Sequence, residues 1–467
     1  MAEKTSYFFC GVGGSGMMPL AAYLVASGHS VRGSDRSRDQ GKSEAKFAAL
    51  ESSGIRLYKQ DGSGVGGGVE ALVVSSAVEE TIPDVKAARE AGLPIVTRGR
   101  LLADLFNNSK TRVAVAGTSG KSTVTGMIGT ILSEAGRDPT VLNGGLIRNF
   151  MKGSQDYFAN LRIGRGDLFV AEMDESDGSI SHYQPSIAVL TNIALDHKPM
   201  DELEALFGAY LERTVGTQVL NADDQAVKAL AKKFDPKKAL WFGIQDFSGD
   251  FRAEDIRLRP DGVDFVLNMN DRARHPVHLN VPGRHNVLNA LAALGAAVAA
   301  GVEPGTASHA LSAFKGIRRR MEIVGSVNGI TVIDDFGHNP DKVAASLSAL
   351  KDFPGRLIVF YQQHGYKPLE RMRKEFGRAF ADHLSPNDLV LLPDVFYAGG
   401  TVERTVTAED FAGDLRRAGL KALWKPTRDE LLGVITEAAH DGDRVVIMGA
   451  RDDTLSDFAR DVLSALS

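Results

Sequence analysis

A glycine-rich loop between an apolar strand and a helix is the strongest restriction on the fold of this chain. Arg112 to Ala116 predicts a buried strand, and a helical segment follows the loop Gly117-Thr118-Ser119-Gly120-Lys121-Ser122-Thr123. Glycines allow backbone N–H groups to approach phosphate oxygens, and the N-terminus of the helix adds its dipole. Lys121 can bridge the outer phosphates, and the Ser122 hydroxyl can bind Mg²⁺. Val115 stands where the general pattern begins with glycine, so the match is to a shortened form, GTxGK[ST].

Short apolar segments alternate with helical ones along the whole chain. Tyr7 to Cys10 predicts a strand, a helix is expected from Met17 to Ser27, and a second strand ends near Asp35. Further strands are predicted at 71–74, 168–171, 187–190, 331–333, 356–361, 389–392 and 444–448. This alternation is typical of parallel sheets with helices on both faces, so we expect an α/β fold.

The length and composition fit a globular protein of several domains. The 467 residues suffice for roughly two to four domains. With 54 Lys and Arg against 59 Asp and Glu, the net charge of −5 predicts neither nucleic acid nor a membrane surface as partner. The single cysteine, Cys10, excludes an internal disulfide and is expected to be a small buried side chain. The longest apolar stretch, Leu288 to Val298, is too short to span a bilayer, and no signal-peptide pattern is present, so we predict a cytoplasmic protein.

Two predicted strands end in side chains that can bind a metal ion. The strand 168–171 is followed at once by Glu172 and by further carboxylates as far as Asp177. Ligands bind at the carboxyl ends of parallel strands, and a strand-end acid commonly supplies a Mg²⁺ ligand beside a phosphate-binding loop. His197, after the strand 187–190, is either a structural histidine or a further ligand. Ser122 and Glu172 are therefore predicted metal ligands, and the role of His197 stays open.

Seven short strings in a fixed order resemble those of the Mur ligase family. They are Gly11 to Met17, Gly33 to Asp35, Gly117 to Thr123, Glu172 to Ser179, Thr191 to His197, Pro282 to Ala290 and Asp334 to Pro340. The resemblance spans nearly the whole chain and is closest to the branch that adds L-alanine to UDP-N-acetylmuramate. It implies a Rossmann-like UDP-sugar-binding domain in residues 1–108, a central P-loop ATPase domain in 109–318 and a Rossmann-like acceptor-binding domain in 319–467.

The resemblance also implies a reaction. In this family ATP phosphorylates the substrate carboxylate, an amine attacks the acyl phosphate, and the tetrahedral intermediate loses phosphate. The implied function is an ATP-dependent ligase of peptidoglycan precursor synthesis that joins UDP-N-acetylmuramate and L-alanine, with ATP and Mg²⁺ as cofactors. A monomer and a homodimer both remain compatible with it.

The matching motifs assign three groups of site residues. The catalytic set is Lys121, Glu172, His197 and Asp335. The resemblance also implies that Ser122 and Glu172 hold one Mg²⁺ and that His197 holds another, so the implied metal ligands are these three residues. The ATP-binding residues are Gly117, Thr118, Ser119, Gly120, Lys121, Ser122, Thr123, His285, Asn286, Asn289, Arg319 and Asp335. The residues that contact the substrates are Gly11, Gly13, Gly14, Ser15, Gly16, Met17, Asp35, Ser75, Ser76, His338 and His364.

The chain departs from the alanine-adding branch mainly in the predicted third domain. Ser119 replaces the histidine of GTHGKTT, and Asn339 replaces the second histidine of DDYGHHP. Gly365 and Pro368 stand where FQPHRYxR has its two arginines. Neither residue can hold a carboxylate as an arginine does, so we expect weak saturation by L-alanine and a gain from Gly365→Arg. Lys367 and Arg371 are the candidates for a compensating cation.

Three other functions fit parts of the same pattern. A ligase of this family that adds a recycled tripeptide fits the rewritten acceptor motif. A nucleotide-binding regulatory protein without turnover would retain the fold, although it has no need for Lys121, Glu172, His197 and Asp335 together. A dinucleotide-dependent dehydrogenase fits the first glycine turn and Asp35 but leaves the second glycine loop unexplained. The glycine run 62–68 lacks a following helix and is predicted to be a surface loop.

Overall fold

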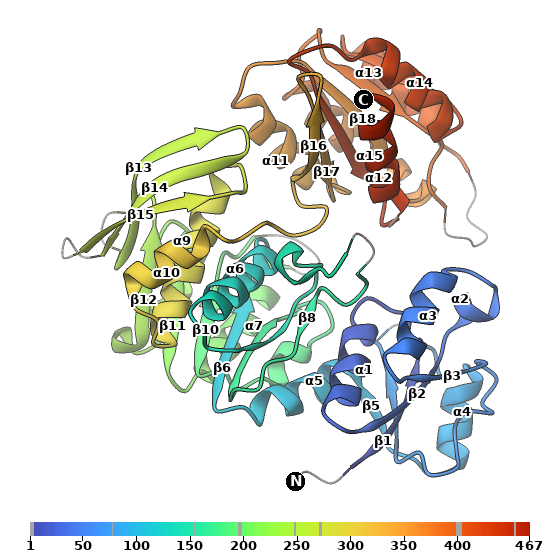
Figure 1. Ribbon diagram of the computed structural model, residues 1–467, viewed down its shortest axis with the longest axis vertical. Helices are drawn as coiled ribbons and strands as arrows, with labels where there is room; N and C mark the ends of the chain where they lie inside the picture. The colour runs from blue at the N-terminus through green and yellow to red at the C-terminus, as the bar shows by residue number, and fades with distance from the viewer. Residues whose placement is uncertain are drawn as a thin grey trace. The chain divides into compact units, whose positions relative to one another are not determined.

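The computed structural model divides into two compact units, which Figure 1 shows as ribbons. It describes residues 4–76, 78–153, 156–194, 199–246, 249–269, 273–397, 404–452 and 454–467. Unit 1 comprises Met1–Ile256, Asp264–Leu279 and His285–Gly316, and unit 2 comprises Arg257–Val263, Asn280–Arg284 and Ile317–Ser467. The described residues form three sheets: a first sheet and a central sheet in unit 1, and a third sheet in unit 2.

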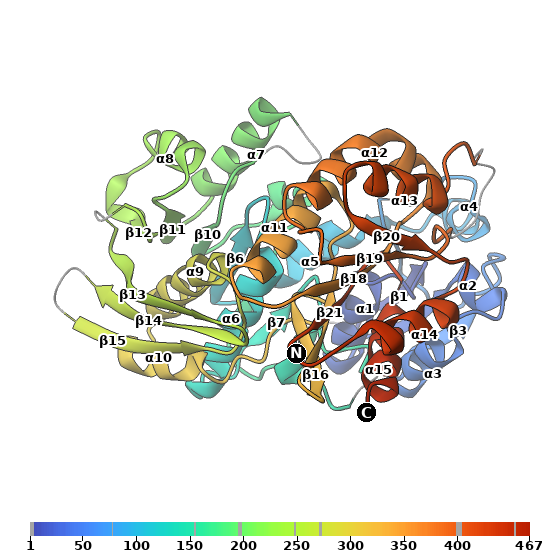
Figure 2. The same ribbon diagram turned by 90° about the horizontal axis from the view of Figure 1, so that it is seen from above.

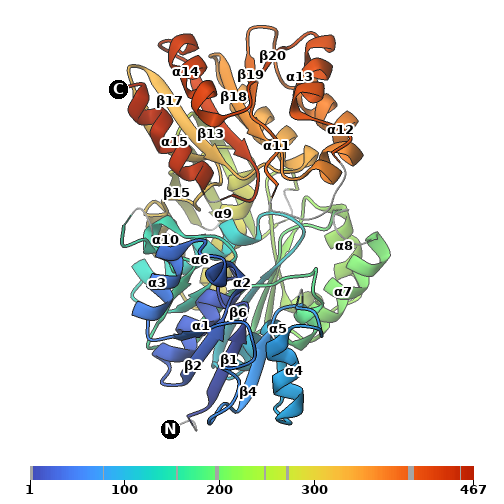
Figure 3. The same ribbon diagram turned by 90° about the vertical axis from the view of Figure 1, so that its right-hand side faces the viewer.

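The first sheet of unit 1 is parallel, with the order β3-β2-β1-β4-β5. Figure 3 shows β2 and β4 on either side of β1, so the strand order reverses at β1. Ligands of open α/β sheets bind at such a reversal, which places the glycine turn after β1 at a favourable position. The elements are β1 (Ser6–Cys10), α1 (Met17–Ala26), β2 (Ser30–Ser34), α2 (Arg36–Asp39), α3 (Glu44–Ser52), β3 (Arg56–Tyr58), β4 (Ala71–Val74), α4 (Pro83–Glu90), β5 (Ile95–Thr97) and α5 (Arg98–Asn107).

The central sheet has the order β15-β14-β13-β12-β11-β10-β6-β9-β7-β8. Its parallel middle, β10-β6-β9, carries the glycine-rich loop after β6. Figure 2 shows β13, β14 and β15 side by side at one end, with α10 against β15. The elements are β6 (Thr111–Ala116), α6 (Lys121–Glu134), β7 (Thr140–Leu142), η1 (Arg148–Phe150), β8 (Leu161–Arg162), β9 (Leu168–Glu172), η2 (Ser179–His182), β10 (Ile187–Leu190), α7 (Met200–Glu212), β11 (Thr217–Asn221), α8 (Gln225–Ala231), η3 (Pro236–Lys238), β12 (Ala239–Gly243), β13 (Phe251–Arg259), β14 (Gly262–Met269), β15 (Ala273–Leu279), α9 (His285–Ala299) and α10 (Pro304–Leu311).

The sheet of unit 2 has the order β16-β17-β21-β18-β19-β20. Only β16 pairs antiparallel among the strands of this sheet that the structure describes. The elements are β16 (Glu322–Val327), β17 (Ile330–Asp335), α11 (Pro340–Lys351), β18 (Leu357–Gln362), α12 (Tyr366–Ala381), β19 (Leu389–Leu392), α13 (Ala408–Arg417), β20 (Lys421–Trp424), α14 (Arg428–Ala438), β21 (Arg444–Gly449) and α15 (Thr454–Ala465).

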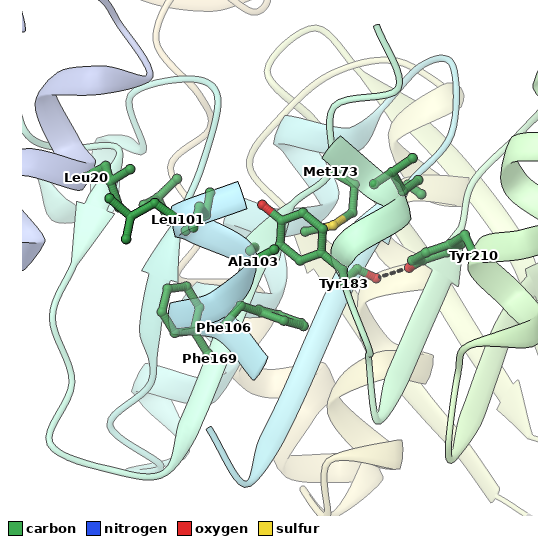
Figure 4. Packing of buried hydrophobic residues seen from close by; sticks show 14 of the residues in the cluster. Leu20, Leu101, Ala103, Phe106, Phe169, Met173, Tyr183 and Tyr210 are labelled. Atoms are coloured by element: carbon green, nitrogen blue, oxygen red, sulfur yellow. Dashed lines mark hydrogen bonds between the residues drawn. The ribbon is translucent and has the colours of Figure 1, made fainter. Parts of the chain in front are cut away.

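A buried aromatic cluster joins helix α5 to the central sheet within unit 1. Figure 4 shows Phe106 of α5 beside Phe169 of β9 and near Tyr183. Phe106 meets these two rings edge to face, with centroids 5.7 Å and 5.3 Å apart. Burial of each such side chain contributes about 1.5–3 kcal/mol, and the ring geometry adds to it. The cluster therefore explains why the first and central sheets form one compact unit.

The predicted α/β class and most of the predicted strands are confirmed. Glu172 is the last residue of β9, as expected from the end of its apolar run. The antiparallel partners β8 and β16 lacked a pattern strong enough to be predicted. Residues 62–68 form the loop between β3 and β4, and the next helix, α4, begins only at Pro83. Within the described ranges, no helix is long and apolar enough to cross a membrane.

Candidate functional site

The glycine-rich loop of unit 1 joins the buried strand β6 to helix α6. Gly117 and Gly120 have φ values of +131° and +86°, which L side chains rarely adopt. A Cβ atom on Gly117 would lie 2.1 Å from Thr191 Oγ1, and one on Gly120 would lie 2.5 Å from Asn289 Oδ1. Both positions therefore require glycine for conformation and for space. The first turn of α6, which includes Thr123, leaves backbone N–H groups without helical partners, and phosphate oxygens can accept from them.

The ammonium group of Lys121 is held against this loop by three acceptors. Its Nζ donates to the carbonyl oxygens of Gly117 at 2.7 Å and Thr118 at 3.4 Å, and to Glu175 Oε1 at 2.8 Å. Glu175 is only 5% exposed, and its Oε2 has no hydrogen-bond partner among the residues that the structure describes. A buried carboxylate with an unpaired oxygen is unfavourable unless a nearby charge offsets it. The ion pair with Lys121 supplies that charge and orients the ammonium group.

Ser122 and Glu172 meet at the start of α6. Ser122 Oγ donates to Glu172 Oε1 at 3.0 Å, and the backbone N–H of Gly144 donates to Glu172 Oε2 at 2.7 Å. Hydroxyl and carboxylate oxygens are the ligands that Mg²⁺ prefers, so this pair fits the predicted metal site. The third predicted ligand, His197, lies outside the described residues. Among the residues that are described, no three His, Cys, Asp or Glu side chains are grouped to hold a metal ion.

Asparagine side chains from the segment after β10 and from α9 border the loop. Asn192 Oδ1 accepts from the backbone N–H of Ser119 at 2.9 Å, and Asn192 Nδ2 donates to the Ser119 carbonyl at 3.0 Å. The buried Asn289 donates to Asn286 Oδ1 at 3.0 Å. His285, the first residue of α9, is exposed. The structure thus brings the predicted Asn286 and Asn289 to the loop, together with Asn192, which the sequence did not single out as a site residue.

The turn after β1 is fixed by the acid at the end of β2. The backbone N–H of Gly13 donates to Asp35 Oδ2 at 2.9 Å, while Asp35 Oδ1 caps helix α2 through the N–H of Ser37 at 2.8 Å. Gly11 has a φ of +79°, and Met17 begins α1. The remaining predicted turn residues are Gly14, Ser15 and Gly16, and the predicted Ser75 and Ser76 directly follow the neighbouring strand β4. These residues therefore gather at one edge of the first sheet.

Arg98, at the start of α5, connects this turn to the carboxylates after β9. Its Nη2 lies 3.0 Å from Asp177 Oδ2 and 3.6 Å from Asp174 Oδ2. A Cβ atom on Gly16 would lie 3.0 Å from Arg98 Nη1. Asn160 Nδ2 also donates to the carbonyl of Ser15, at 3.3 Å. A cation therefore stands beside the first glycine turn. No sequence pattern indicated it, because its nearer partner in space, Asp177, lies 79 residues away in the chain.

Asp335 of unit 2 fixes the backbone around the end of β17. Its Oδ1 accepts from the N–H of Met321 at 2.9 Å, and its Oδ2 accepts from the N–H of Gly337 at 3.0 Å and the hydroxyl of Ser346 at 2.7 Å. It is 5% exposed. These contacts give Asp335 a structural role within unit 2, and its predicted contact with ATP remains a prediction.

Arg319 is buried in the same part of unit 2. Its guanidinium lies 3.3 Å from Asp334 and donates to the carbonyls of Ala450 at 3.1 Å and Asp452 at 3.0 Å. Burial raises the pKa of Asp334 to about 6, and the charge of Arg319 opposes that rise. A φ of +58° at Arg319 is maintained by this network. Its predicted role in ATP binding likewise remains untested.

The two predicted histidines of unit 2 follow β17 and β18, the strands on either side of β21. His338 packs edge to face on Phe336 and contacts Arg451, with 3.4 Å between His338 Nε2 and Arg451 Nη2. Burial lowers the pKa of His338 to about 4. His364 stacks on Phe396, and burial lowers its pKa as well. Both imidazoles are therefore neutral near pH 7 and can donate or accept hydrogen bonds without carrying charge.

Comparisons with known proteins identify this arrangement over nearly the whole chain. Three family descriptions match in sequence order: the Mur ligase family catalytic domain at residues 6–110, the Mur ligase middle domain at 115–297, and the Mur ligase glutamate ligase domain at 319–451. The UDP-N-acetylmuramate–L-alanine ligase of Nitrobacter winogradskyi is 34% identical, over 95% of this chain and 94% of its own. That of Solibacter usitatus is 36% identical, over 95% of this chain and 92% of its own.

Solved structures give the same result. The UDP-N-acetylmuramate–alanine ligase MurC of Thermotoga maritima is 25% identical, with a TM-score of 0.80 and coverage of 98% of both chains. The murein peptide ligase of Psychrobacter arcticus is also 25% identical, with a TM-score of 0.67, and covers 99% of this chain and 98% of its own. The resemblance stated from the motifs is thereby confirmed.

Proposed function

The chain belongs to the Mur ligase family, and from this premise we propose that it joins L-alanine to the carboxylate of UDP-N-acetylmuramate with the use of ATP. The carboxylate oxygen attacks the γ-phosphorus and ADP leaves. The amine nitrogen of L-alanine then attacks the acyl carbon, phosphate leaves, and the nitrogen loses a proton. The product amide belongs to peptidoglycan precursor synthesis, which takes place in the cytoplasm.

One observation carries this proposal: Lys121, Ser122 and Glu172 converge at the start of α6 beside the glycine-rich loop. Phosphoryl transfer to a carboxylate brings together two anions, so the site must supply positive charge and fixed donors. Lys121 and the N–H groups of the first turn of α6 meet that need. Bound Mg²⁺ would withdraw charge from the transferred phosphoryl group, and Ser122 and Glu172 are the residues that would hold it.

The other substrate is assigned to the edge of the first sheet. The turn Gly11–Met17, Asp35, Ser75 and Ser76 would contact the UDP part, since a glycine turn at a strand-order reversal accommodates a diphosphate closely. Arg98 stands beside this turn and would add charge complementary to the diphosphate. The protein would act as a monomer or a homodimer.

A ligase that adds a tripeptide is the second candidate. Gly365 and Pro368 favour it, because they leave the matching motif of unit 2 without its arginines. The lower TM-score against the murein peptide ligase and the names of the relatives favour L-alanine.

ADP release tests the proposal directly. The protein would be supplied with ATP, Mg²⁺ and UDP-N-acetylmuramate, and then with L-alanine, glycine, L-serine or the tripeptide. We expect release to depend on both the UDP-sugar and L-alanine, with a product heavier by one alanine residue. Release only with the tripeptide would establish the second candidate, and no release with any acceptor would exclude ligase activity.

A further inference from the structure

The segments that follow β18 and β19 in unit 2 run side by side and carry aromatic rings. The N–H of Phe396 donates to the carbonyl of Gln363, and the N–H of Gly365 donates to the carbonyl of Phe396, both at 2.9 Å. Tyr366 and Tyr397 meet edge to face with centroids 5.6 Å apart. Figure 3 shows β18 and β19 as neighbours with α12 close by. These residues lie beyond the carboxyl ends of parallel strands, where ligands of such sheets bind.

Arg404 lies over both tyrosine rings. Its Cζ is 5.2 Å from the ring centroid of Tyr366 and 5.9 Å from that of Tyr397. The faces of the rings attract the guanidinium, while its N–H groups point outward in its own plane. Arg404 is exposed, and no residue in the described ranges forms an ion pair or hydrogen bond with it. The rings therefore orient a cation whose donors remain available.

Two other arginines of unit 2, Arg428 and Arg373, already have partners. Arg428 donates to Gln362 Oε1 and pairs with Asp452 at 2.5 Å. Arg373 pairs with Asp414. Those side chains are consequently less able to accept a new anion than Arg404 is.

Two polar atoms near the same strand ends lack partners among the described residues. They are Nε2 of Gln363, a side chain that is 3% exposed, and Nδ1 of His364. Buried polar atoms without partners are unfavourable unless a ligand or water satisfies them. The surroundings of β18 therefore combine a cation with an unsatisfied amide donor and an imidazole nitrogen that can donate in one tautomer, and this combination suits a carboxylate.

We propose that Arg404, oriented by Tyr366 and Tyr397, binds the carboxylate of the amino-acid acceptor. The inference rests on the proposed ligase function. A guanidinium holds a carboxylate through two parallel N–H···O bonds, which fixes the direction of the remainder of the amino acid. The amine is then left unbound at this end and available to attack the acyl carbon. Arg404 would thus determine acceptor specificity without taking part in phosphoryl transfer.

A comparison of L-alanine with L-alaninamide, which lacks the carboxylate, distinguishes carboxylate binding by Arg404 from a structural role. We would measure ADP release at saturating ATP and UDP-N-acetylmuramate for the wild type, Arg404→Ala and Arg404→Lys. Loss of a charged hydrogen-bonding partner predicts a KM for L-alanine that rises about 10- to 100-fold in Arg404→Ala. The KM for L-alaninamide, which is already high in the wild type, should stay within about twofold. Arg404→Lys should recover part of the loss, because it restores the charge but not the paired donors.

Lys374→Ala is the matched control, because it removes an exposed cation from α12 and should leave both KM values unchanged. If the wild type is active and Arg404→Ala has the same KM for L-alanine, this inference is overturned while the ligase function stands. Equal loss for L-alanine and L-alaninamide would also overturn it, since that result would assign Arg404 a structural role. A wild type inactive with every acceptor would overturn the ligase function and this inference with it.

Discussion

Lys121 in unit 1 and Arg404 in unit 2 are cations held in opposite ways. Lys121 is enclosed by loop carbonyls and by Glu175, a buried carboxylate. Arg404 is exposed and rests on the faces of two tyrosine rings. The lysine belongs to a continuous motif, the loop Gly117–Thr123. The arginine instead contacts two tyrosines that lie 38 and seven residues before it in the chain. The first kind of site is visible in a sequence, and the second becomes visible only when the chain has folded.

The largest expected effect comes from Lys121→Ala. Loss of the only charge that the loop itself supplies to the phosphates should lower kcat/KM by about 10³ or more, with UDP-sugar binding nearly intact. Steady-state ADP release and equilibrium binding of UDP-N-acetylmuramate measure the two quantities. Lys110→Ala, an exposed change just before β6, is the control. Near-normal activity of Lys121→Ala would remove the basis for calling the loop a nucleotide site.

Glu175→Gln tests whether the buried carboxylate orients Lys121. The substitution keeps the shape of the side chain but removes the charge of an ion pair at 2.8 Å. We expect kcat/KM for ATP to fall about 10- to 100-fold and the protein to lose stability, because Lys121 keeps neutral acceptors but loses its buried counter-charge. Glu134→Gln, exposed at the end of α6, should change neither. A lower KM for ATP would show instead that Glu175 competes with the nucleotide for the lysine.

Gly365→Arg probes the unit 2 side of the comparison. From the sequence alone, this change was expected to improve the use of L-alanine. Gly365 has a φ of +84°, however, and its added Cβ would lie 3.3 Å from Pro368 Cδ. We now expect a loss of about 1–3 kcal/mol in the free energy of unfolding, without a gain in affinity for L-alanine. Gly377→Arg, inside the helix that Gly365 precedes and with open space at the Cβ position, is the control in urea unfolding.

The smallest effect is expected at acid pH from His338. Its pKa of about 4 in the folded protein lies below the value of about 6.5 in an unfolded chain. The unfolded chain therefore takes up the proton first as the pH falls, and stability decreases between about pH 6.5 and 4. His338→Gln removes this contribution and should flatten the decrease in that window, as followed by urea unfolding. The exposed His440→Gln should leave the curve as it is, and an equal change in both variants would argue against a specific role of His338.

The sequence was most informative where function depends on backbone shape. Gly117, Gly120 and Glu172 could be predicted because glycine conformations and strand ends leave local patterns. Glu175 is one of several carboxylates after β9, and no sequence pattern indicates which of them contacts Lys121. Arg98 pairs with a carboxylate far away in the chain, and Arg404 lies over two rings of which one, that of Tyr366, is also far away; a single sequence contains no record of such contacts. The predicted domain boundaries and the metal role of His197 remain predictions.

The single cysteine of the chain offers a way to observe the first sheet opening. Cys10 is fully buried at the end of β1, and burial, with the charge of Asp84 adding to it, raises its pKa to about 12. Its thiol should therefore resist alkylation at neutral pH as long as β1 stays in place. Any modification then reports transient opening of that sheet, and its rate gives the free energy of opening. Slower alkylation upon addition of a UDP-sugar would locate its binding at the first sheet without a mutation or an assay of turnover.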